Sequence, residues 1–341
     1  MSLLRRRLHP EGLISTTVPA TRADSPGLPA GQARVVWRFS DGRPGHDSQS
    51  LGLVEALGRC LSVDVHTLPV PEHSVTWRDL ITSRYAAGAR LPDPWLLVGA
   101  GRRTQLPLLA AARARKGRTV VVMRPAFPRP LYDLCIIPDH DKPAVAPNVL
   151  ISRGSLNRAQ RVTGQHRTQG MILVGGPSRH HHWRDEAVAA QIARVIRDSP
   201  PREWVLATSR RTPAGFAAWV CRQVNCADKT LALMMWQGEE SGFRVAAQLG
   251  RSACAWVTQD SVSMVYEALT AGVATGLLEV PACRRNRVVE GIRRLAATGQ
   301  LTGFGDWVAG KPLQEPGECF DEANRSARWI CEKWGSTSSR S

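Results

Sequence analysis

The sequence predicts an α/β protein built from two doubly wound, Rossmann-like domains that face a cleft. From residue 33 onward, short apolar runs alternate with helical stretches, a pattern typical of parallel sheets covered on both faces. A polar segment without periodicity at residues 154–169 interrupts this alternation, which then starts again. With 341 residues, the chain also exceeds the length that one hydrophobic core usually serves. We therefore expect domains at residues 33–153 and 170–312, joined by a linker at residues 154–169.

The first domain is expected to contain six strands, because six short runs are rich in β-branched and apolar residues. These runs are residues 34–40, 62–68, 95–101, 119–125, 134–139 and 148–152. Amphipathic stretches at residues 51–61 and 104–116 predict two helices between them.

The second domain shows the same alternation without any residue-level repeat of the first. Strands are expected at residues 171–178, 204–211, 231–236, 253–261 and 274–280. Helices are expected at residues 185–197, from residue 213, and from residue 261.

The two ends of the chain are predicted from composition and spacing. Residues 1–32 carry four arginines, three of them consecutive, but no continuous apolar run, so they do not form a secretory signal. Their Pro, Gly and Ser content predicts a disordered basic extension, with a transit-like peptide or a basic surface tether as alternatives. Apolar residues at helical spacing predict one closing helix within residues 313–334, followed by a disordered tail at residues 335–341.

The charge balance restricts the class of partner. Lys and Arg number 45 against 29 Asp and Glu, which gives a net charge of +16 and favours nucleic acid, anionic lipid or phosphorylated substrates. A general preference for arginine in the source genome explains the excess equally well. Nucleic acid is disfavoured, because the arginines are scattered and only three Tyr and six Phe are present for stacking. The eight cysteines form no CxxC pair and indicate free thiols in a reducing compartment.

The first candidate site lies in the stretch "SDGRPGHDSQS", between an expected strand and an expected helix. Gly42 and Gly45 allow backbone amides to approach a ligand, and Ser48 or Asp47 can cap the helix. His46 is a candidate general base because its ordinary pKa lies near neutrality. The alternative is a capped turn with an exposed histidine.

Two further corners carry glycine pairs. In "LLVGAGRRTQLP", Gly99 and Gly101 precede a helix whose amides, with Arg102 or Arg103, suit an anion, although a tight turn would also need glycines. In "MILVGGPSRHHHW", the stretch from Gly175 to Ser178 ends a very apolar strand. The free amides of that stretch are expected to form a nest for a diphosphate.

The three histidines at residues 180–182 do not predict a metal site. Consecutive histidines rarely converge on one ion, and no acid or cysteine nearby completes a ligand set. We expect them to form a polar segment leading into the next helix.

The fourth corner is "VTQDSVSMVYEALTAG". Asp260, Ser261 and Ser263 crowd a helix N-terminus, where hydroxyls and amides can hold phosphate oxygens. Glu267 lies four residues after Ser263, on the same helix face, where it can accept hydrogen bonds from ribose hydroxyls. A simple capping box is the alternative. Nearby, Arg210 and Arg211 can neutralise a diphosphate.

Six of these stretches, in this order, resemble a known family. They are "DGRPGHDSQSLGL", "GAGRRT", "PDHD", "LVGGPS", "TSRRTP" and "VTQDSVSMVYEA". Together they resemble the mitochondrial-fission family named for elongated mitochondria, whose bacterial members are often labelled predicted nucleoside-diphosphate-sugar epimerases. The resemblance runs from about residue 33 to residue 280, and that family is in turn similar to GT-B glycosyltransferases.

The resemblance implies a role for each motif. Glu267 would hold the ribose, Ser263 would lie near the phosphates, and His46 or Asp41 would face the acceptor. The residues expected on the nucleotide-sugar side are Gly175, Gly176, Ser178, Ser209, Arg210, Arg211, Asp260, Ser261, Ser263, Met264 and Glu267. Those expected on the acceptor side are Gly42, Gly45, Gln49, Gly99, Gly101, Arg102, His140 and Asp141.

The epimerase label is not supported by short-chain epimerase motifs. Such an enzyme would need GxGxxG after its first strand and a Tyr-x-x-x-Lys pair. The first corner has a different pattern, and neither Tyr132 nor Tyr266 has a lysine four residues later.

The resemblance therefore implies a metal-independent glycosyltransferase that needs no cofactor. Its donor would be a nucleoside-diphosphate sugar, and its acceptor an anionic lipid or envelope glycan. The alternative is a non-catalytic adaptor that recruits a partner to a membrane, as the plant members of the family are implicated in doing. Either function fits a cytoplasmic protein in peripheral contact with the inner membrane, or with the mitochondrial surface in a eukaryote.

Overall fold

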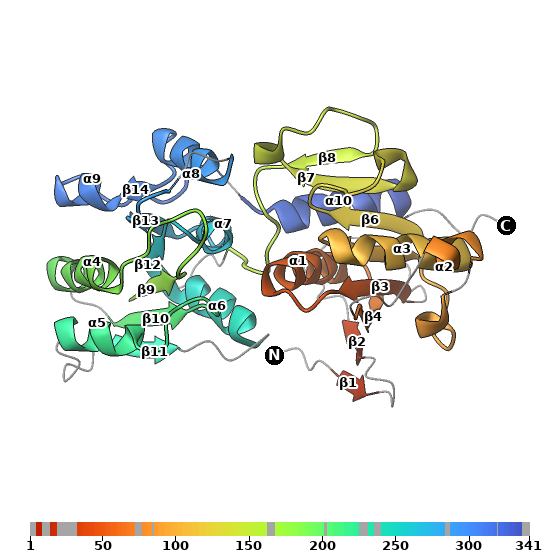
Figure 1. Cartoon of the computed structure of the whole chain (residues 1–341), viewed down its shortest axis with the longest axis horizontal. Coiled ribbons are helices and arrows are strands. Elements are labelled where there is room, and N and C mark those ends of the chain that lie inside the picture. The colour runs from red at the N-terminus through yellow and green to blue at the C-terminus, as the bar shows by residue number, and fades with distance from the viewer. Residues whose placement is uncertain are drawn as a thin grey trace. The chain divides into compact units, whose positions relative to one another are not determined.

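The computed structural model divides the chain into two compact units (Figure 1). The first unit comprises Met1–Arg158 and Glu322–Ser341, and the second comprises Ala159–Asp321. The structure describes residues 5–8, 14–18, 33–71, 77–83, 85–161, 168–200, 203–224, 231–234, 240–283, 287–318 and 320–335.

The first unit is built on an eight-stranded sheet with the order β1-β2-β4-β3-β5-β6-β7-β8. Strands β3 to β8 are parallel, whereas β1 and β2 join one edge in antiparallel pairing. The strands are β1 (Arg5–Leu8), β2 (Ile14–Val18), β3 (Arg34–Ser40), β4 (Val63–Pro69), β5 (Leu96–Ala100), β6 (Arg118–Val122), β7 (Leu134–Pro138) and β8 (Val149–Ser152). The order reverses at β3, since β4 lies on one side of it and β5 on the other.

Helices cover both faces of this sheet. On one face, Leu53 and Leu57 of α1 and Ile330 of α10 pack with β-strand residues in one core cluster. On the other face, Leu108 of α3 packs with Trp37 and Phe39 of β3 in a second cluster, which Leu80 of α2 also joins. The helices are α1 (Pro44–Cys60), α2 (Trp77–Ile81), α3 (Arg102–Arg115) and α10 (Glu322–Trp334).

The second unit contains a six-stranded parallel sheet with the order β11-β10-β9-β12-β13-β14. Here the order reverses between β9 and β12. The strands are β9 (Gln169–Val174), β10 (Trp204–Thr208), β11 (Leu231–Met234), β12 (Ser252–Thr258), β13 (Ala274–Leu278) and β14 (Thr302–Gly303). The helices are α4 (Asp185–Asp198), α5 (Phe216–Val224), α6 (Glu240–Arg251), α7 (Val262–Thr270), α8 (Arg287–Ala297) and α9 (Phe304–Val308).

Two clusters sandwich the second sheet in the same way. Leu249 of α6, Leu269 of α7 and Ile292 of α8 pack with one face. Val188 of α4 and Phe216 of α5 pack with the other. The predicted fold class, two doubly wound α/β domains, is therefore confirmed, and each sheet is buried on both sides as its apolar strands require.

The first helix begins earlier than its apolar pattern predicts. Helix α1 starts at Pro44 rather than at residue 51, because proline fits the first turn of a helix, where its missing N–H costs no bond. The turn between β3 and α1 is therefore shorter than predicted, and Gly45 and His46 belong to the helix itself.

The chain ends also differ from the sequence-based expectation. Two antiparallel strands, β1 and β2, form within residues 1–32, which were expected to be disordered; β2 is the β-branched run "ISTTV". The other residues of that extension, and residues 336–341 of the expected tail, lie outside the described residues. The closing helix occupies Glu322–Trp334 and is part of the first unit.

The segment expected to be a polar linker is partly buried where it is described. Leu156 and Asn157 are buried in the first unit, and Ala159 is buried in the second. Residues 162–167 lie outside the described residues. None of the helices in the described part of the chain combines the length and apolar character that crossing a bilayer requires.

A buried ion pair joins β3 to α1. Arg38 Nη1 donates to Asp47 Oδ1 at 2.9 Å, and Ser40 Oγ donates to the same oxygen at 2.6 Å. Both charged residues are only 4% exposed. Asp47 was expected to cap the helix, but the cap residue is Arg43 and no side chain makes the cap hydrogen bond. Asp47 instead lies in the first turn of the helix, where it fixes α1 against β3.

Removing this carboxylate tests how strongly the pair holds α1. Asp47→Ala removes one member of a buried ion pair and the acceptor that Arg38 and Ser40 share, so we expect the free energy of unfolding to fall by about 3–5 kcal/mol. Urea unfolding followed by circular dichroism measures the change. In the control, Asp198→Ala removes the exposed pair with Arg194 and should cost about 1 kcal/mol or less. Equal losses in the two variants would contradict this assignment.

Candidate functional site

In each unit, polar residues follow the two strands between which the strand order reverses. In the first unit, Asp41 follows β3 and Gly101 follows β5. In the second unit, Gly175 follows β9, and Asp260 lies two residues beyond β12. Ligands of open α/β sheets bind outside the carboxyl ends of the strands at this switch point. The sequence-predicted residues therefore define one candidate half-site in each unit.

In the first unit, the half-site contains a hydrogen-bonded carboxylate and imidazole. His46 Nδ1 lies 2.9 Å from Asp41 Oδ2. The Asp41 side chain is fully buried, and its Oδ1 accepts a hydrogen bond from the Arg43 amide at 3.2 Å. The His46 side chain retains 18% exposure. The carboxylate thus holds the imidazole while leaving part of the ring accessible.

The next corner packs directly on this imidazole. Gly101 has a φ of +82°, and a Cβ there would lie 2.3 Å from both Cε1 and Nδ1 of His46. Only glycine avoids this overlap, and it also adopts the left-handed backbone without strain. Gly101 thus has a packing role against His46, and its role in approaching an anion stays a prediction.

The arrangement of His46 suits proton transfer. With Nδ1–H donating to Asp41, Nε2 carries the lone pair that accepts a proton. Among the described residues, Nε2 has no hydrogen-bond partner. A buried carboxylate behind the ring is the arrangement that orients the imidazole in acid–base pairs of this type.

The remaining acceptor-side residues are only partly brought together. Gly42 has a φ of +69° and open space around it, and the Gln49 amide donates to the Gly45 carbonyl at 3.1 Å. Arg102 is exposed at the first position of α3, and Gly99 is buried inside β5. His140 and Asp141 lie in a short turn after β7. They share the edge of the sheet with Asp41 but lie two strands from β5.

In the second unit, Asp260 occupies the turn that was expected to be an open nest. Gly176 N–H donates to Asp260 Oδ2 at 3.0 Å, and Gly175 N–H donates to Thr258 Oγ1 at 2.8 Å. A Cβ on Gly175 would lie 2.2 Å from the same Oδ2. The expectation of free amides is thus wrong, because these donors are satisfied within the unit.

The basic loop after β10 closes over this carboxylate. Arg211 Nη2 donates to Asp260 Oδ2 at 2.7 Å, and its Nη1 donates to the Gly176 carbonyl at 2.9 Å. Ser209 Oγ donates to the Gly175 carbonyl at 2.7 Å. Arg211 and Ser209 therefore hold the turn together. Arg210 is exposed, and no partner contacts it within the described part of the chain.

The N-terminus of α7 begins immediately after Asp260. Its cap residue is Ser261, and no side chain makes the cap hydrogen bond, so the predicted capping box is absent. Ser263 is exposed, while Met264 and Glu267 are half-buried. A positive helix end with an exposed hydroxyl, and a carboxylate one turn further along, is an arrangement that binds phosphate and diol groups.

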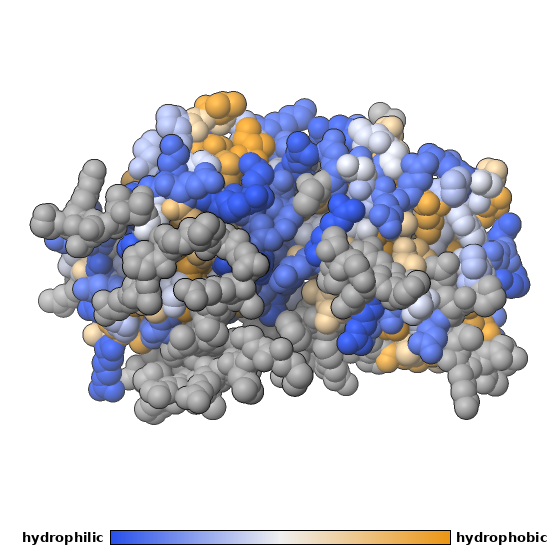
Figure 2. Space-filling model, turned by 180° about the vertical axis from the view of Figure 1, so that it is seen from behind, coloured by the Kyte–Doolittle hydropathy of each residue, from blue (hydrophilic) through white to orange (hydrophobic). Residues whose placement is uncertain are grey.

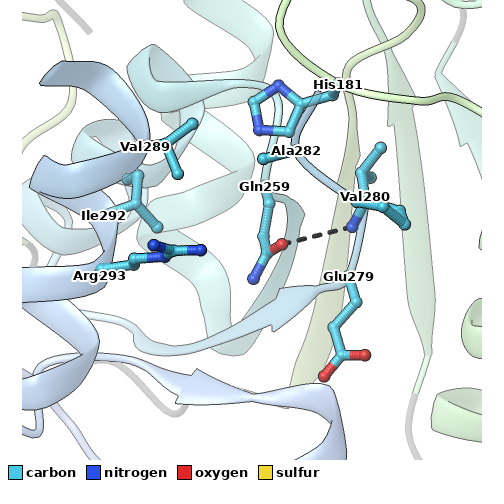
Figure 3. Close-up of a pocket in the computed structure, with 9 residues that line it drawn as sticks. His181, Gln259, Glu279, Val280, Ala282, Val289, Ile292 and Arg293 are labelled. Carbon is cyan, nitrogen blue, oxygen red and sulfur yellow. Dashed lines mark hydrogen bonds between the residues drawn. The ribbon is translucent and has the colours of Figure 1, made fainter. Parts of the chain in front are cut away.

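A pocket of about 300 Å³ lies at the same edge of the second sheet (Figure 3). Val289, Ile292 and Arg293 approach it from α8, and Gln259 approaches it from the end of β12. The other lining residues are His181, Glu279, Val280, Pro281 and Ala282. Apart from His181, sequence reasoning missed these residues, although Gln259 and Glu279 follow the carboxyl ends of two adjacent strands.

The histidine segment borders this pocket instead of leading simply into α4. The segment pairs with the loop after β13: His182 N–H donates to the Pro281 carbonyl, and Cys283 N–H donates to the His180 carbonyl. His181 is buried, and desolvation lowers its pKa below the ordinary 6.5, which favours a neutral ring. Within the described residues, no group of His, Cys, Asp or Glu is arranged to hold a metal ion.

Solved structures share this two-unit architecture. The UDP-GlcNAc 2-epimerase from Methanocaldococcus jannaschii is 12% identical, with a TM-score of 0.52 over 88% of this chain and 100% of its own. The UDP-GlcNAc 2-epimerase from Neisseria meningitidis, bound to UDP-GlcNAc, is 10% identical, with a TM-score of 0.49 over 90% of this chain and 100% of its own. A glycosyltransferase from Rickettsia africae is 7% identical, with a TM-score of 0.41 over 90% of each chain.

The likeness to the Methanocaldococcus jannaschii structure, with the sheet order of each unit, supports the class of fold, a pair of Rossmann-like domains. The chain belongs to the mitochondrial fission ELM1 family, whose model matches residues 44–334. The resemblance seen in the sequence motifs is therefore confirmed. A search of curated proteins found no match. The missing short-chain motifs argue against a short-chain epimerase but do not bear on the 2-epimerases that share this fold.

Two glycine substitutions test the contact between Gly101 and His46. In Gly42→Ala the added Cβ meets no neighbour, so the only loss of unfolding free energy is the strain of a left-handed backbone at alanine, about 1–2 kcal/mol. Gly101→Ala costs the same strain and also displaces the imidazole, so we expect a larger loss of unfolding free energy. It should also shift the ring resonances of His46 in NMR spectra. Equal losses, with unchanged His46 resonances in both variants, would show that the ring does not pack on Gly101.

Proposed function

We propose that this protein binds a nucleoside-diphosphate sugar in its second unit and transfers the sugar, without a metal ion, to an envelope or lipid-linked acceptor. The observation that carries the proposal is the N-terminus of α7. It is uncapped by any side chain, with Ser263 exposed and Glu267 one turn further along. Membership of the ELM1 family and the fold shared with a UDP-GlcNAc 2-epimerase support it.

The donor diphosphate would bind at the start of α7. The amides of the first helical turn and the helix dipole favour an anion there, and the Ser263 hydroxyl adds a donor. Exposed Arg210 supplies a positive charge from the neighbouring loop. One turn along the helix, Glu267 would accept hydrogen bonds from the two ribose hydroxyls. Arg211 is not assigned this role, because Asp260 already neutralises it.

The sugar would occupy the pocket beside this helix end. Gln259 lies directly before Asp260 in the chain, and with His181 and Arg293 it offers donors and acceptors to ring hydroxyls. Val280 and Ile292 provide the apolar surface against which a pyranose face packs. A pocket with a few polar groups on an apolar wall is typical of small-molecule sites.

The first unit would activate the acceptor. His46 Nε2 would take the proton of an acceptor hydroxyl as its oxygen forms a bond to the anomeric carbon. The bond from that carbon to the diphosphate breaks, and the nucleoside diphosphate leaves with the electron pair. Asp41 would stabilise the imidazolium until the proton passes to water. The charge on the leaving group would be stabilised by the end of α7.

The charge of the chain supports an anionic acceptor. A net charge of +16 favours contact with anionic lipid or envelope glycan over neutral surfaces. We therefore propose a cytoplasmic protein in peripheral contact with the membrane that carries the acceptor.

A second candidate function, a non-catalytic adaptor, is favoured by one observation. The amides of Gly175 and Gly176 are already satisfied by Thr258 and Asp260, and Arg211 is neutralised. A turn closed in this way suits a family member that has kept the fold and lost part of the donor site. The variants described below separate the two functions.

Replacing Glu267 tests the donor site. Glu267→Gln removes a charged acceptor, so donor affinity should fall about 10- to 100-fold, equivalent to about 1.5–3 kcal/mol. Titration calorimetry with UDP-, GDP-, ADP- and CMP-sugars measures it. Glu186→Gln, in the first turn of α4, is the control and should bind as the wild type does. If the wild type binds none of the four classes, the donor proposal is wrong.

Replacing His46 tests the acceptor half of the reaction. His46→Asn should lower kcat by about 10² to 10⁴ and leave donor affinity unchanged, because the general base is lost. The exposed His182 provides the control variant His182→Asn, whose rate should not change. Rates are measured by release of nucleoside diphosphate. If His46→Asn and Glu267→Gln both restore a strain that lacks the gene, the adaptor function is supported instead.

A further inference from the structure

Two cysteines meet where the first and last helices of the first unit pack together. Cys60 is the last residue of α1, and Cys331 lies in the last turn of α10. Both are half-buried, and both pack against the same core cluster, which includes Ile330 and Trp334. Their thiols are joined by a side-chain hydrogen bond. They lie 271 positions apart in the sequence, so the fold alone brings them together.

The surroundings shift the pKa values of the two thiols in opposite directions. The hydrogen bond from Cys331 lowers the pKa of Cys60 to about 7, and the positive charges of Arg59 and Arg328 also lower it. The same contact, together with burial, raises the pKa of Cys331, and Glu332 adds to that effect. At neutral pH, about half of the Cys60 thiols are therefore ionised, next to a protonated Cys331 thiol.

Cys135 and Cys283 differ from this pair. Burial raises the pKa of Cys135 to about 11, so this thiol stays protonated and unreactive at neutral pH. Cys283 is exposed, and its thiol makes no contact with another cysteine in the described part of the chain. The pair at the ends of α1 and α10 thus combines accessibility, thiolate character and a resolving partner. These are the features of a redox-sensing site.

We propose that Cys60 and Cys331 form a reversible disulfide, driven by a peroxide, that fastens α10 to α1. The Cys60 thiolate attacks one peroxide oxygen, the O–O bond breaks, and a sulfenic acid and hydroxide form. The Cys331 thiol then attacks the sulfenic sulfur, which gives the disulfide and releases water. Peroxide accepts the two electrons that the two thiols lose, and a dithiol reverses the reaction.

The bond would act on the segment by which the chain returns to the first unit. Helix α10 follows the second unit in sequence, yet it packs on α1, whose other end carries His46. Arg59 Nε already donates to Asn324 Oδ1 across the two helices at 2.9 Å. A covalent link between α1 and α10 would close a loop of about 270 residues. Because such a link restricts the unfolded chain, the disulfide should raise the free energy of unfolding.

The test treats the full-length protein with a small molar excess of hydrogen peroxide at neutral pH, then blocks the remaining thiols. Mass spectrometry of a digest made without reductant should show the Cys60 and Cys331 peptides linked, with the loss of two hydrogens. Dithiothreitol should restore both thiols. The thermal unfolding midpoint should rise on oxidation and return on reduction.

Variants separate this pair from general thiol oxidation. Cys283→Ser should form the same disulfide as the wild type. Cys331→Ala should leave Cys60 as a sulfenic acid and raise the pH midpoint of its reaction with iodoacetamide from about 7 toward 9. Cys60→Ala, a second variant, should form no disulfide and should leave Cys331 unreacted. The proposal is overturned if Cys283 is oxidised while Cys60 and Cys331 still react fully with the blocking reagent.

Discussion

The reversal of strand order in each parallel sheet is the constraint on which the site depends. Parallel strands need connections that return the chain to the opposite edge of the sheet. The carboxyl ends of β3 to β8 therefore collect on one side of the first sheet, and those of β9 to β14 on one side of the second. Where the order reverses, at β3 and β5 and again at β9 and β12, consecutive helices leave on opposite faces of the sheet. The loops there separate, and side chains such as Asp41 and Asp260 fill the space between them.

The two half-sites use a buried carboxylate in different ways. Asp41 pairs with an imidazole, and this pairing leaves one ring nitrogen able to accept a proton. Asp260 pairs with the guanidinium of Arg211 and with the amide of Gly176, so these donors are satisfied within the unit. In the proposed reaction, the chemistry of the first unit would arise from the Asp41–His46 pair itself. In the second unit the Asp260 carboxylate holds the turn together, and the proposed ligand groups lie on α7, which begins two residues later.

Much of this could be predicted from the sequence because it depends on local pattern. Continuous apolar strands identified both sheets, and the position of Ser263 and Glu267 on one helix face follows from helical spacing alone. Hydrogen-bond partners could not be predicted, because they depend on which corners meet. Asp47 was expected to cap α1, yet it pairs with Arg38, since the helix begins at Pro44. The partners of the histidine segment and of α10 are likewise distant in sequence.

The most direct test of the account is a crystal structure of the protein soaked with a mixture of nucleoside diphosphates. The account predicts a diphosphate on the amides at the start of α7, near Ser263, with the ribose hydroxyls donating to the Glu267 carboxylate. A nucleotide bound elsewhere on the second unit, with the start of α7 left empty, would contradict the assignment of this helix as the donor site.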